Sequence, residues 1–488
     1  MSQIKRNDSI STSGHKSTNK WVYFFIVSVA SFMVTLDAGI VAVSFPSLVN
    51  SFNTDSSTVV WVTLGYFTIG TGLLFTMGWI GDVMGRRKIY CLGIIIFTSG
   101  LALAPLSQTI FHLILIRMFQ AIGHSMVMAN GLPIITQAFT SGERGKAMGI
   151  FAAVLAVGLG GGPVIGGLIL DSLGWEAIFY SRVPLGIFAL ILAWVILPKH
   201  HAGSEPLRID YFGAIALFVT MGVFLFMLNQ GGRTGFLSTL VLSMGAGTII
   251  MIPLLIWIER RASRPIIDLS LFTQRQFSIG LTLHYIHFVG VGAIFFLSPF
   301  YFINGLGYSP TDAGLFLTVF FVMRIFLSPA SGAFVDKIGY RLPSAVGMGV
   351  MTIGVVLMSQ LGINATLTSI VMSMMVAGFG SALVDPANTS SVMGAVSISR
   401  LGSAGACVAA GRQIGLSTGV ALGGAVFALR EQIYLKAFQN EGIDQAVMGA
   451  KAIVEGFGDG LLVIAIPLGV AVIMGIMKRT NNKSSNQS

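Results

Sequence analysis

Six charged residues stand inside long apolar stretches of this sequence. They are two aspartates and four arginines: Asp37, Arg117, Arg182, Arg324, Asp385 and Arg412. A charge in the middle of a membrane costs at least about 2.5 to 3.5 kcal/mol, so it is rarely present without a partner or a polar cavity. A desolvated carboxyl group can take up and release a proton, and a guanidinium can bind an anion. These six side chains are therefore the candidates for function.

The composition excludes a soluble protein, because 54% of the residues are hydrophobic and 10% are charged, against about 25% charged in a globular domain. A run that crosses about 30 Å of hydrocarbon needs about 20 residues, and backbone that faces lipid must be helical. We therefore predict an all-α membrane protein. It has fourteen predicted spans, at residues 21–45, 58–81, 89–107, 110–139, 147–171, 177–198, 211–229, 238–258, 277–303, 311–335, 342–361, 366–386, 404–429 and 457–477.

The 29 lysines and arginines indicate the orientation of these spans. An even number of spans places both termini on one side, and most of the basic residues fall in segments on that side. Four fall on the other side: Arg233, Arg430, Lys436 and Lys451. By the positive-inside rule both termini are cytoplasmic, in a multi-pass protein of the plasma or inner membrane. The net charge of +10 thus reflects topology and gives no reason to expect a nucleic-acid partner.

The sequence shows no motif for a disulfide framework, a metal site, ATP binding or a catalytic domain. Cys91 and Cys407 stand in or beside apolar runs, and His284 and His287 are the one close histidine pair, so we expect no disulfide, metal or cofactor. No phosphate-binding loop of the type found in ATP-driven pumps is present. The longest predicted loop, about 430–456, is too short for a catalytic domain. We therefore expect a protein that is not an enzyme and draws energy from an ion gradient.

A charged turn occurs twice between apolar runs. The segment 78–88 reads GWIGDVMGRRK, and a degraded copy with Asp336 stands at 332–341. Gly78 and Gly85 permit a tight reversal, while Arg86, Arg87 and Lys88 hold the cytoplasmic face. The copies are more than half the chain apart. The sequence therefore indicates a duplicated membrane transporter with extra spans between its halves.

Four motifs in order resemble those of the major facilitator superfamily, specifically its fourteen-span drug/proton antiporters, over residues 21 to 477. They are the turn at 78–88, the first-span segment 36–46, Arg117 with Gln120 and Gly123, and the fifth-span cluster Gly158, Gly162, Pro163, Gly166 and Gly167. Gly39 and Ala42 replace the Thr and Asn usual in the first-span motif. Glu176 and Arg182 replace an Arg and an Asn usual around Trp175.

The resemblance implies a major facilitator fold, with two six-helix bundles around a central cavity and two extra helices between them. The predicted domains are a cytoplasmic tail (1–20), an N-terminal bundle (21–198), a linker with the two extra spans (199–275), a C-terminal bundle (276–477) and a second tail (478–488).

Asp37 is predicted to carry the coupling proton because a desolvated carboxyl group can load and release one, and the resemblance implies that Arg117 helps to couple protonation to the conformational change. Asp37 stands about 24 Å along the first span at 1.5 Å per residue. Arg117 begins a stripe with Gln120 and His124 at helical spacing, which we expect to face the cavity. The alternatives are structural: Asp37 as the partner of a neighbouring polar group, Arg117 buried against Asp37 or a backbone carbonyl, and His124 as a hydrogen-bonded core histidine.

Two further regions are predicted to control conformation. Asp82 would stabilise the outward-facing state, with Arg144 as its partner and Asp336 as its counterpart; the alternative is a simple topology anchor. The glycines around Pro163 would allow close approach of another helix and a hinge, although glycine is also common in membrane helices.

The arginines in the spans bear on the substrate. Arg182 is near the outer interface and can snorkel, which favours a structural role. Arg324 is too deep to snorkel, and Asp385 is its nearest sensible partner. The predicted cavity residues are His124, His284, His287, Arg324, Asp385 and Arg412. The excess of arginine over aspartate makes a cationic substrate doubtful.

These features predict a proton-coupled secondary transporter that exports amphipathic organic compounds or drugs as a monomer in the lipid bilayer. A carrier of an anionic metabolite or lipid is the alternative. A channel would need a continuous polar lining, and a sensor would usually carry a soluble domain.

Overall fold

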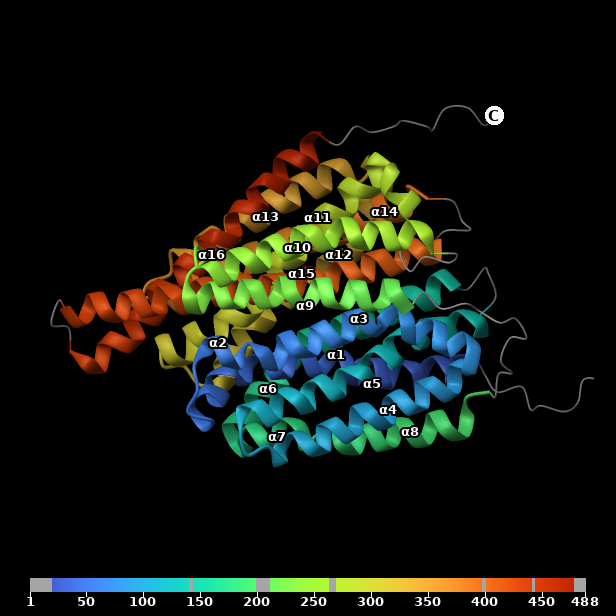
Figure 1. Ribbon diagram of the computed structural model, residues 1–488, viewed down its shortest axis with the longest axis horizontal. Coiled ribbons are helices and arrows are strands. Elements are labelled where there is room, and N and C mark those ends of the chain that lie inside the picture. Colours follow the sequence, from blue (N-terminus) through green and yellow to red (C-terminus); the bar gives the residue numbers. More distant parts are fainter. Residues whose placement is uncertain are drawn as a thin grey trace, which may run out of the picture.

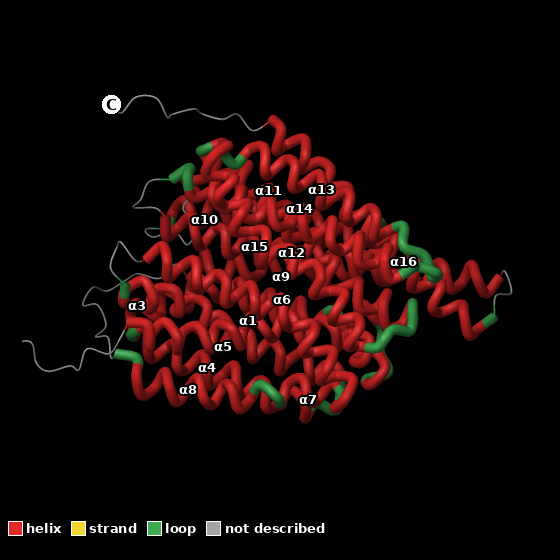
Figure 2. The backbone as a smooth tube through the Cα atoms, turned by 180° about the vertical axis from the view of Figure 1, so that it is seen from behind, coloured by secondary structure: helices red, strands yellow, loops and turns green. Residues whose placement is uncertain are grey.

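The computed structural model describes residues 20–139, 144–198, 211–262, 269–396, 401–440 and 444–477, and their regular structure is helical (Figure 2). The helices are α1 (Lys20–Ser51), α2 (Ser56–Val59), α3 (Trp61–Met84), α4 (Arg86–Leu103), η1 (Ala104–Leu106), α5 (Ile110–Ala138), α6 (Arg144–Leu173), α7 (Trp175–Tyr180), α8 (Val183–Ile196), α9 (Tyr211–Thr234), α10 (Thr239–Arg261), η2 (Leu269–Thr273), α11 (Arg275–Pro299), η3 (Phe300–Gly305), α12 (Pro310–Ile338), α13 (Arg341–Ser359), α14 (Leu367–Met393), α15 (Leu401–Asn440) and α16 (Gln445–Met477).

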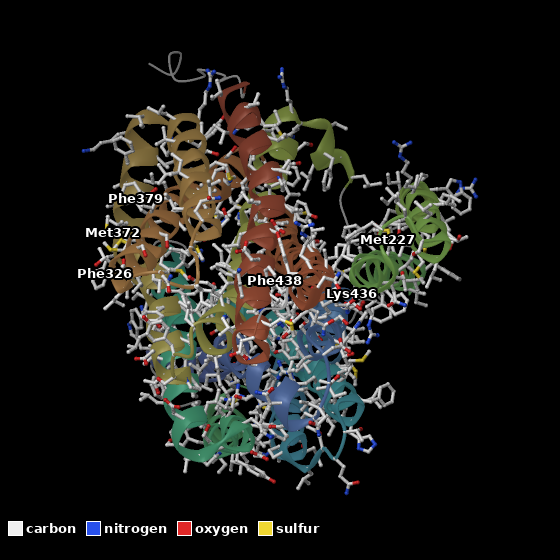
Figure 3. The ribbon with its side chains drawn as sticks, turned by 90° about the vertical axis from the view of Figure 1, so that its left-hand side faces the viewer. Met227, Phe326, Met372, Phe379, Lys436 and Phe438 are labelled. Carbon is white, nitrogen blue, oxygen red and sulfur yellow. The ribbon has the colours of Figure 1, made fainter. Side chains whose placement is uncertain are left out.

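In the described segments, 11 helical stretches are long and apolar enough to cross a membrane, judged by length and composition. Helices α6, α9 and α15 occupy the other predicted spans. Large apolar side chains on the outside fit a lipid surface. Phe326 of α12 and Met372 and Phe379 of α14 are exposed together along one edge of the molecule (Figure 3). The prediction of an all-α membrane protein is confirmed.

The helices form two halves (Figure 1). In the N-terminal half α1 packs against α5, α6 and α8, and α5 packs against α3 and α4. In the C-terminal half α11 packs against α14, α15 and α16, while α14 packs against α12 and α13. The extra helices α9 and α10 pack against each other, and α9 also contacts α3 and α15. The extra pair is therefore attached to both halves.

Turn chemistry explains why the long helices begin and end where they do. Gly85, between α3 and α4, has φ of 96°, and its counterpart Gly339, between α12 and α13, has φ of 79°. Side chains with a β carbon rarely adopt this conformation, so glycine allows both reversals. At the opposite end, helix N-termini are capped by hydroxyl or carboxylate oxygens of Asp55, Thr109, Ser238, Ser309 and Thr366.

The predicted loop at 430–456 is wrong. Helix α15 continues to Asn440 and α16 begins at Gln445, so most of this segment is a helical hairpin that projects from the molecule (Figure 1). Arg430 forms an ion pair with Asp459, and Tyr434 donates a 3.0 Å hydrogen bond to the same carboxylate. These contacts between the two helices extend the hairpin past the apolar runs that marked the spans.

The two halves contact each other at the end of the molecule that the charge distribution assigns to the outside, here called the predicted outer end. Phe45 of α1 packs against Phe296 of α11, with ring centroids 5.0 Å apart. Asp171 of α6 accepts a 2.6 Å hydrogen bond from the Thr311 hydroxyl of α12. Apolar and polar contacts thus join the halves at this end.

Candidate functional site

Asp37 is the centre of a buried cluster in the N-terminal half. Arg117 of α5 lies 2.8 Å from one carboxylate oxygen of Asp37, and Arg182, just before α8, forms an ion pair with the other oxygen. Gln120 accepts a 2.6 Å hydrogen bond from Arg117. Asp37 is 0% exposed and Arg117 1% exposed. These four residues, Asp37, Arg117, Gln120 and Arg182, are here called the N-half charge cluster.

The position of Arg182 corrects a sequence interpretation. We expected it to snorkel to the outer interface, but it is 3% exposed and turned inward. It occupies the break between α7 and α8, next to Val183 and Pro184. Its Nε donates a 3.0 Å hydrogen bond to the Ile178 carbonyl, which aims the guanidinium at Asp37. The break in the helix therefore supplies the second cation of the cluster.

Aromatic and histidine side chains cover one side of the N-half charge cluster. The Arg117 guanidinium lies 4.2 Å from the ring centroid of Tyr66, and the Tyr66 hydroxyl lies 2.8 Å from His124 Nδ1. Arg117 and Gln120 thus face Asp37 and Tyr66 and are sealed from solvent, which corrects the expectation that they face an open cavity. His124 is half-buried. Arg117 Nε and Arg182 Nη2 are buried without a hydrogen-bond partner among the described residues.

The glycines of α6 place this helix between the two halves. A β carbon on Gly162 would lie 2.6 Å from the Gly39 Cα of α1, and one on Gly166 would lie 2.9 Å from the Ile40 carbonyl oxygen. On the other side, a β carbon on Gly167 would collide with the Pro310 carbonyl of α12. Small residues allow such close helix contacts. Helix α6 therefore touches α1 and α12 at backbone distance.

Two more members of the predicted glycine-proline cluster take part in these contacts. Gly158 lies against Thr35 and Phe32 of α1, and the Pro163 carbonyl lies against Gly314 of α12. Helix α6 is one continuous helix through Pro163. The predicted close approach is present, while the predicted hinge remains a prediction.

A second group of charges lies in the C-terminal half. Arg324 of α12 donates a 2.6 Å hydrogen bond to Asp385 of α14, which confirms the pairing expected from the sequence. His284 Nδ1 of α11 lies 3.7 Å from the other oxygen of Asp385. The Arg412 guanidinium of α15 lies 6.0 Å from the ring centroid of Phe288. The residues His284, Arg324, Asp385 and Arg412 are here called the C-half charge cluster.

The two histidines of α11 have different surroundings. His287 Nε2 lies 2.7 Å from the Ser381 hydroxyl of α14, whereas His284 faces Asp385. Both are buried. Among the described residues, no three His, Cys, Asp or Glu side chains are grouped as a metal ion requires. The C-half charge cluster therefore consists of two guanidiniums, one carboxylate and one buried imidazole.

The predicted cytoplasmic gate is described only in part. The backbone reverses at Gly85, but the side chains of Asp82, Arg144 and Asp336 lie outside the described residues, so their gating role stays a prediction. A β carbon on Gly78 would lie 3.7 Å from the Ala129 side chain of α5. Arg87 donates a hydrogen bond to the Trp194 carbonyl of α8, which is a contact within one half.

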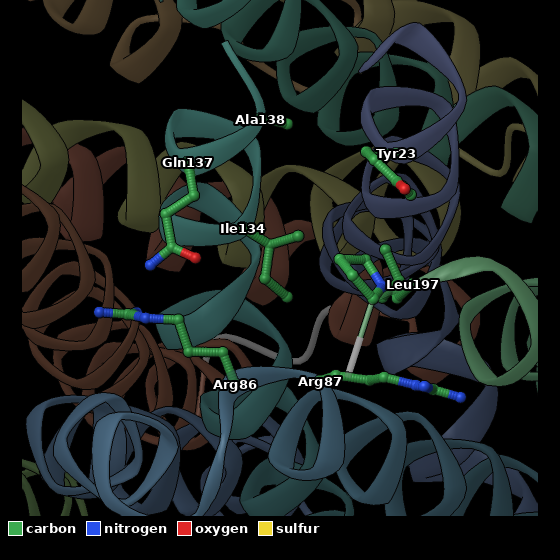
Figure 4. A pocket seen from close by; sticks show the side chains of 8 residues that line it. Tyr23, Arg86, Arg87, Ile134, Gln137, Ala138 and Leu197 are labelled. Carbon is green, nitrogen blue, oxygen red and sulfur yellow. The ribbon is translucent and has the colours of Figure 1, made fainter. Parts of the chain in front are cut away.

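A small cavity of about 160 Å³ lies beside this turn, with Arg86 and Arg87 extending in opposite directions (Figure 4). Its lining also includes Tyr23, Ile134 and Gln137, all from the N-terminal half. Ligand pockets usually measure about 300 to 1,000 Å³. The cavity is away from both charge clusters, and we assign it no substrate.

Helix α2 joins both halves to the extra helices at the predicted outer end. Arg233 of α9 lies 3.2 Å from Asp55, and the Asn229 side chain donates a 3.0 Å hydrogen bond to the Ser57 carbonyl. Glu431 of α15, two residues past the predicted span, is hydrogen-bonded to Ser56 and faces Asp55. Burial raises the pKa of Glu431 to about 7; the Asp55 charge adds to this shift and the Ser56 hydrogen bond opposes it.

A helical membrane protein with two packed halves, an extra helix pair and a charge cluster in each half has the architecture of a secondary transporter. The family model described as Major Facilitator Superfamily matches residues 27–300 and 281–431. The chain belongs to the major facilitator superfamily, a family of transporters.

Similar proteins are named as transporters of organic compounds. The chain is 32% identical over 409 residues to the riboflavin transporter RibZ of Clostridioides difficile, covering 84% of this chain and 88% of that protein. It is 31% identical over 405 residues to the multidrug transporter MdtP of Bacillus subtilis, covering 82% and 74%.

Solved structures agree on the fold. An inward-facing, unoccupied bacterial homologue of the human lysosomal transporter Spinster has a TM-score of 0.70 and 16% sequence identity, covering 95% of this chain and 98% of that one. At this identity the likeness concerns the fold alone.

Proposed function

We propose that this chain is a proton-coupled antiporter that exports amphipathic organic compounds by alternating access. The same proposal assigns it to the fourteen-span drug/proton antiporters and makes it a functional monomer of the cell membrane with cytoplasmic termini. The names of the relatives support export of organic compounds, since they include a riboflavin transporter and a multidrug transporter. The N-half charge cluster supports proton coupling.

The observation that carries this proposal is the place of Asp37 on α1. Asp37 stands two residues before Gly39, where α1 touches Gly162 of α6 at backbone distance. Helix α6 in turn touches α12 of the other half through Pro163 and Gly167. A change at the carboxylate therefore reaches the contact between the halves through two helix interfaces.

Protonation of Asp37 changes the forces in this cluster. The ionised carboxylate is bound by Arg117 and Arg182 on opposite oxygens. A proton on Asp37 removes the negative charge and leaves two guanidiniums in a dry site, where like charges repel strongly. This repulsion would push helices α5 and α8, which present the two arginines, to move relative to α1. This movement is how proton binding would favour one conformation over the other.

Transport in liposomes tests the proposal. The purified protein is reconstituted, a pH gradient with an acidic lumen is imposed, and uptake of riboflavin, a cationic dye and an anionic dye is followed together with lumen pH. The proposal predicts that at least one compound accumulates, that the lumen becomes more alkaline as it does, and that a protonophore abolishes both. Uptake that a protonophore leaves unchanged contradicts proton coupling.

A further inference from the structure

The C-half charge cluster contains one guanidinium that its carboxylate does not bind at ion-pair distance among the described residues. Asp385 forms an ion pair with Arg324 at 2.6 Å. Arg412 reaches the same group of side chains from α15, but among the described residues no carboxylate lies within ion-pair distance of it. An unpaired guanidinium inside a membrane span is costly unless water or a ligand reaches it.

Exposure distinguishes this cluster from the sealed one in the N-terminal half. Asp37 is fully buried with both of its arginines, whereas the Asp385 side chain is 27% exposed and Arg412 is exposed. Arg412 faces Asp385, Arg324 and Phe288, which belong to three other helices, so its exposed side chain is in the interior and away from the lipid surface. Solvent-accessible space therefore reaches the Arg412 side chain.

Aromatic rings lie beside the two arginines. The Phe288 ring centroid is 5.7 Å from the Arg324 guanidinium and 6.0 Å from that of Arg412. Phe321 lies 5.8 Å from Arg324 and packs against Gly160 of α6, at the contact between the halves. Phe288 is 1% and Phe321 2% exposed, so these rings pack behind the two guanidiniums and form a closed apolar wall of the site.

We propose that Arg412 binds an anionic group, such as a carboxylate or phosphate, on an amphipathic substrate that enters between the halves. The proposal rests on the transport function proposed above and adds the charge of the substrate. Arg324 stays bound to Asp385, so the charge preference comes from Arg412. A planar guanidinium suits such an anion because it can donate two parallel hydrogen bonds.

Dye binding without any pH gradient tests this site. Fluorescein and rhodamine 6G share a xanthene ring system but carry opposite charge, so the pair isolates the effect of charge. Binding to detergent-solubilised protein is measured by fluorescence anisotropy. The parent should bind fluorescein more tightly, and Arg412→Gln should weaken fluorescein binding by about tenfold or more while rhodamine 6G binding is unchanged or tighter.

Two further variants control for folding and for general charge effects. Arg412→Lys keeps the charge and should retain part of the fluorescein affinity. Arg430→Gln removes an arginine from the same helix at the projecting hairpin and should leave both dyes unaffected. The proposal is overturned if the parent fails to prefer fluorescein, if Arg412→Gln loses both dyes alike, or if Arg430→Gln has the same effect. If dye binding depends on Arg412 but the protein shows no proton-driven transport, the proposed proton coupling is contradicted and the proposed anion site is supported.

Discussion

Arg182 and Asp37 form a fully buried ion pair although 145 residues separate them. Arg117 binds the other oxygen of the same carboxylate, so α1, α5 and the start of α8 are held together by one acid and two bases. Breaking a buried pair costs far more than breaking an exposed one, because the remaining charge is left in a dry environment. The N-half charge cluster therefore holds these three segments together, and in the proposed function it is also the group that responds to a proton.

Removing Arg182 should destabilise the protein more than removing an arginine from an exposed pair. We expect Arg182→Gln to lower the free energy of unfolding by about 3 to 5 kcal/mol. The matched control is Arg233→Gln, because the Arg233–Asp55 pair is about half exposed and worth at most about 1 kcal/mol. Thermal unfolding in detergent compares the two variants. Equal losses in Tm would show that the Arg182–Asp37 pair stabilises the protein no more than the exposed Arg233–Asp55 pair does.

The pair in the C-terminal half should behave as a coupled unit. Arg324→Gln leaves Asp385 without its 2.6 Å partner, and Asp385→Asn leaves Arg324 unpaired, so each should lower Tm by several degrees. The double variant leaves neither member of this pair as an uncompensated charge and should lose clearly less than the sum of the two. Strictly additive losses in Tm would mean that the two side chains do not stabilise each other.

Much of this architecture could be predicted from the sequence because it depends on local patterns. Apolar runs mark the helices, Gly85 marks the reversal, and the spacing of the repeated turns reveals the extra pair. The hairpin at 430–456 was missed because the helices continue there on polar contacts, such as Arg430 with Asp459, which leave no apolar run. Arg182 was misplaced because its direction depends on the break between α7 and α8 and on a partner far away in the chain.

A methyl group at Gly314 should open the predicted outer end. A β carbon there would collide with the Pro163 carbonyl, so Gly314→Ala should weaken the contact between α6 and α12. Spin labels at Leu173→Cys and Ile363→Cys, both exposed and in opposite halves, report the distance across this end in a protein with Cys91 and Cys407 replaced by serine. We expect a population at longer distances.

Gly161→Ala is the matched control for this measurement, because the nearest atom to a β carbon there is the Ile165 side chain at 4.0 Å. Its distance distribution should equal that of the parent. If Gly314→Ala gives the same distribution too, the α6–α12 contact does not hold this end closed.

Acid should favour closure of the predicted outer end through Glu431. The pKa of Glu431 is about 7 when it is buried beside Asp55 and returns towards 4.5 when the contact opens, so closing takes up a proton between these values. Closure therefore becomes less favourable as pH rises from about 4.5 through 7 and changes little at still higher pH, so acid favours closure. Asp55, Arg233, Arg430 and Asp459 are the neighbouring charges, and all belong to pairs.

The same spin-label pair measures this effect. Raising the pH from 6 to 8 should increase the long-distance population in the parent. Glu431→Gln should remain closed at both values, because its side chain is neutral throughout. A pH response of the same size in Glu431→Gln would assign the titration to another group.

The central claim is that Asp37 carries the coupling proton, and Asp37→Asn tests it most directly. Asparagine keeps the size of the side chain but cannot titrate. In liposomes containing equal substrate on both sides, Asp37→Asn should still exchange labelled substrate, while accumulation driven by an acidic lumen should be lost; Asp37→Glu should recover part of it. Undiminished uphill accumulation by folded Asp37→Asn protein would contradict the account.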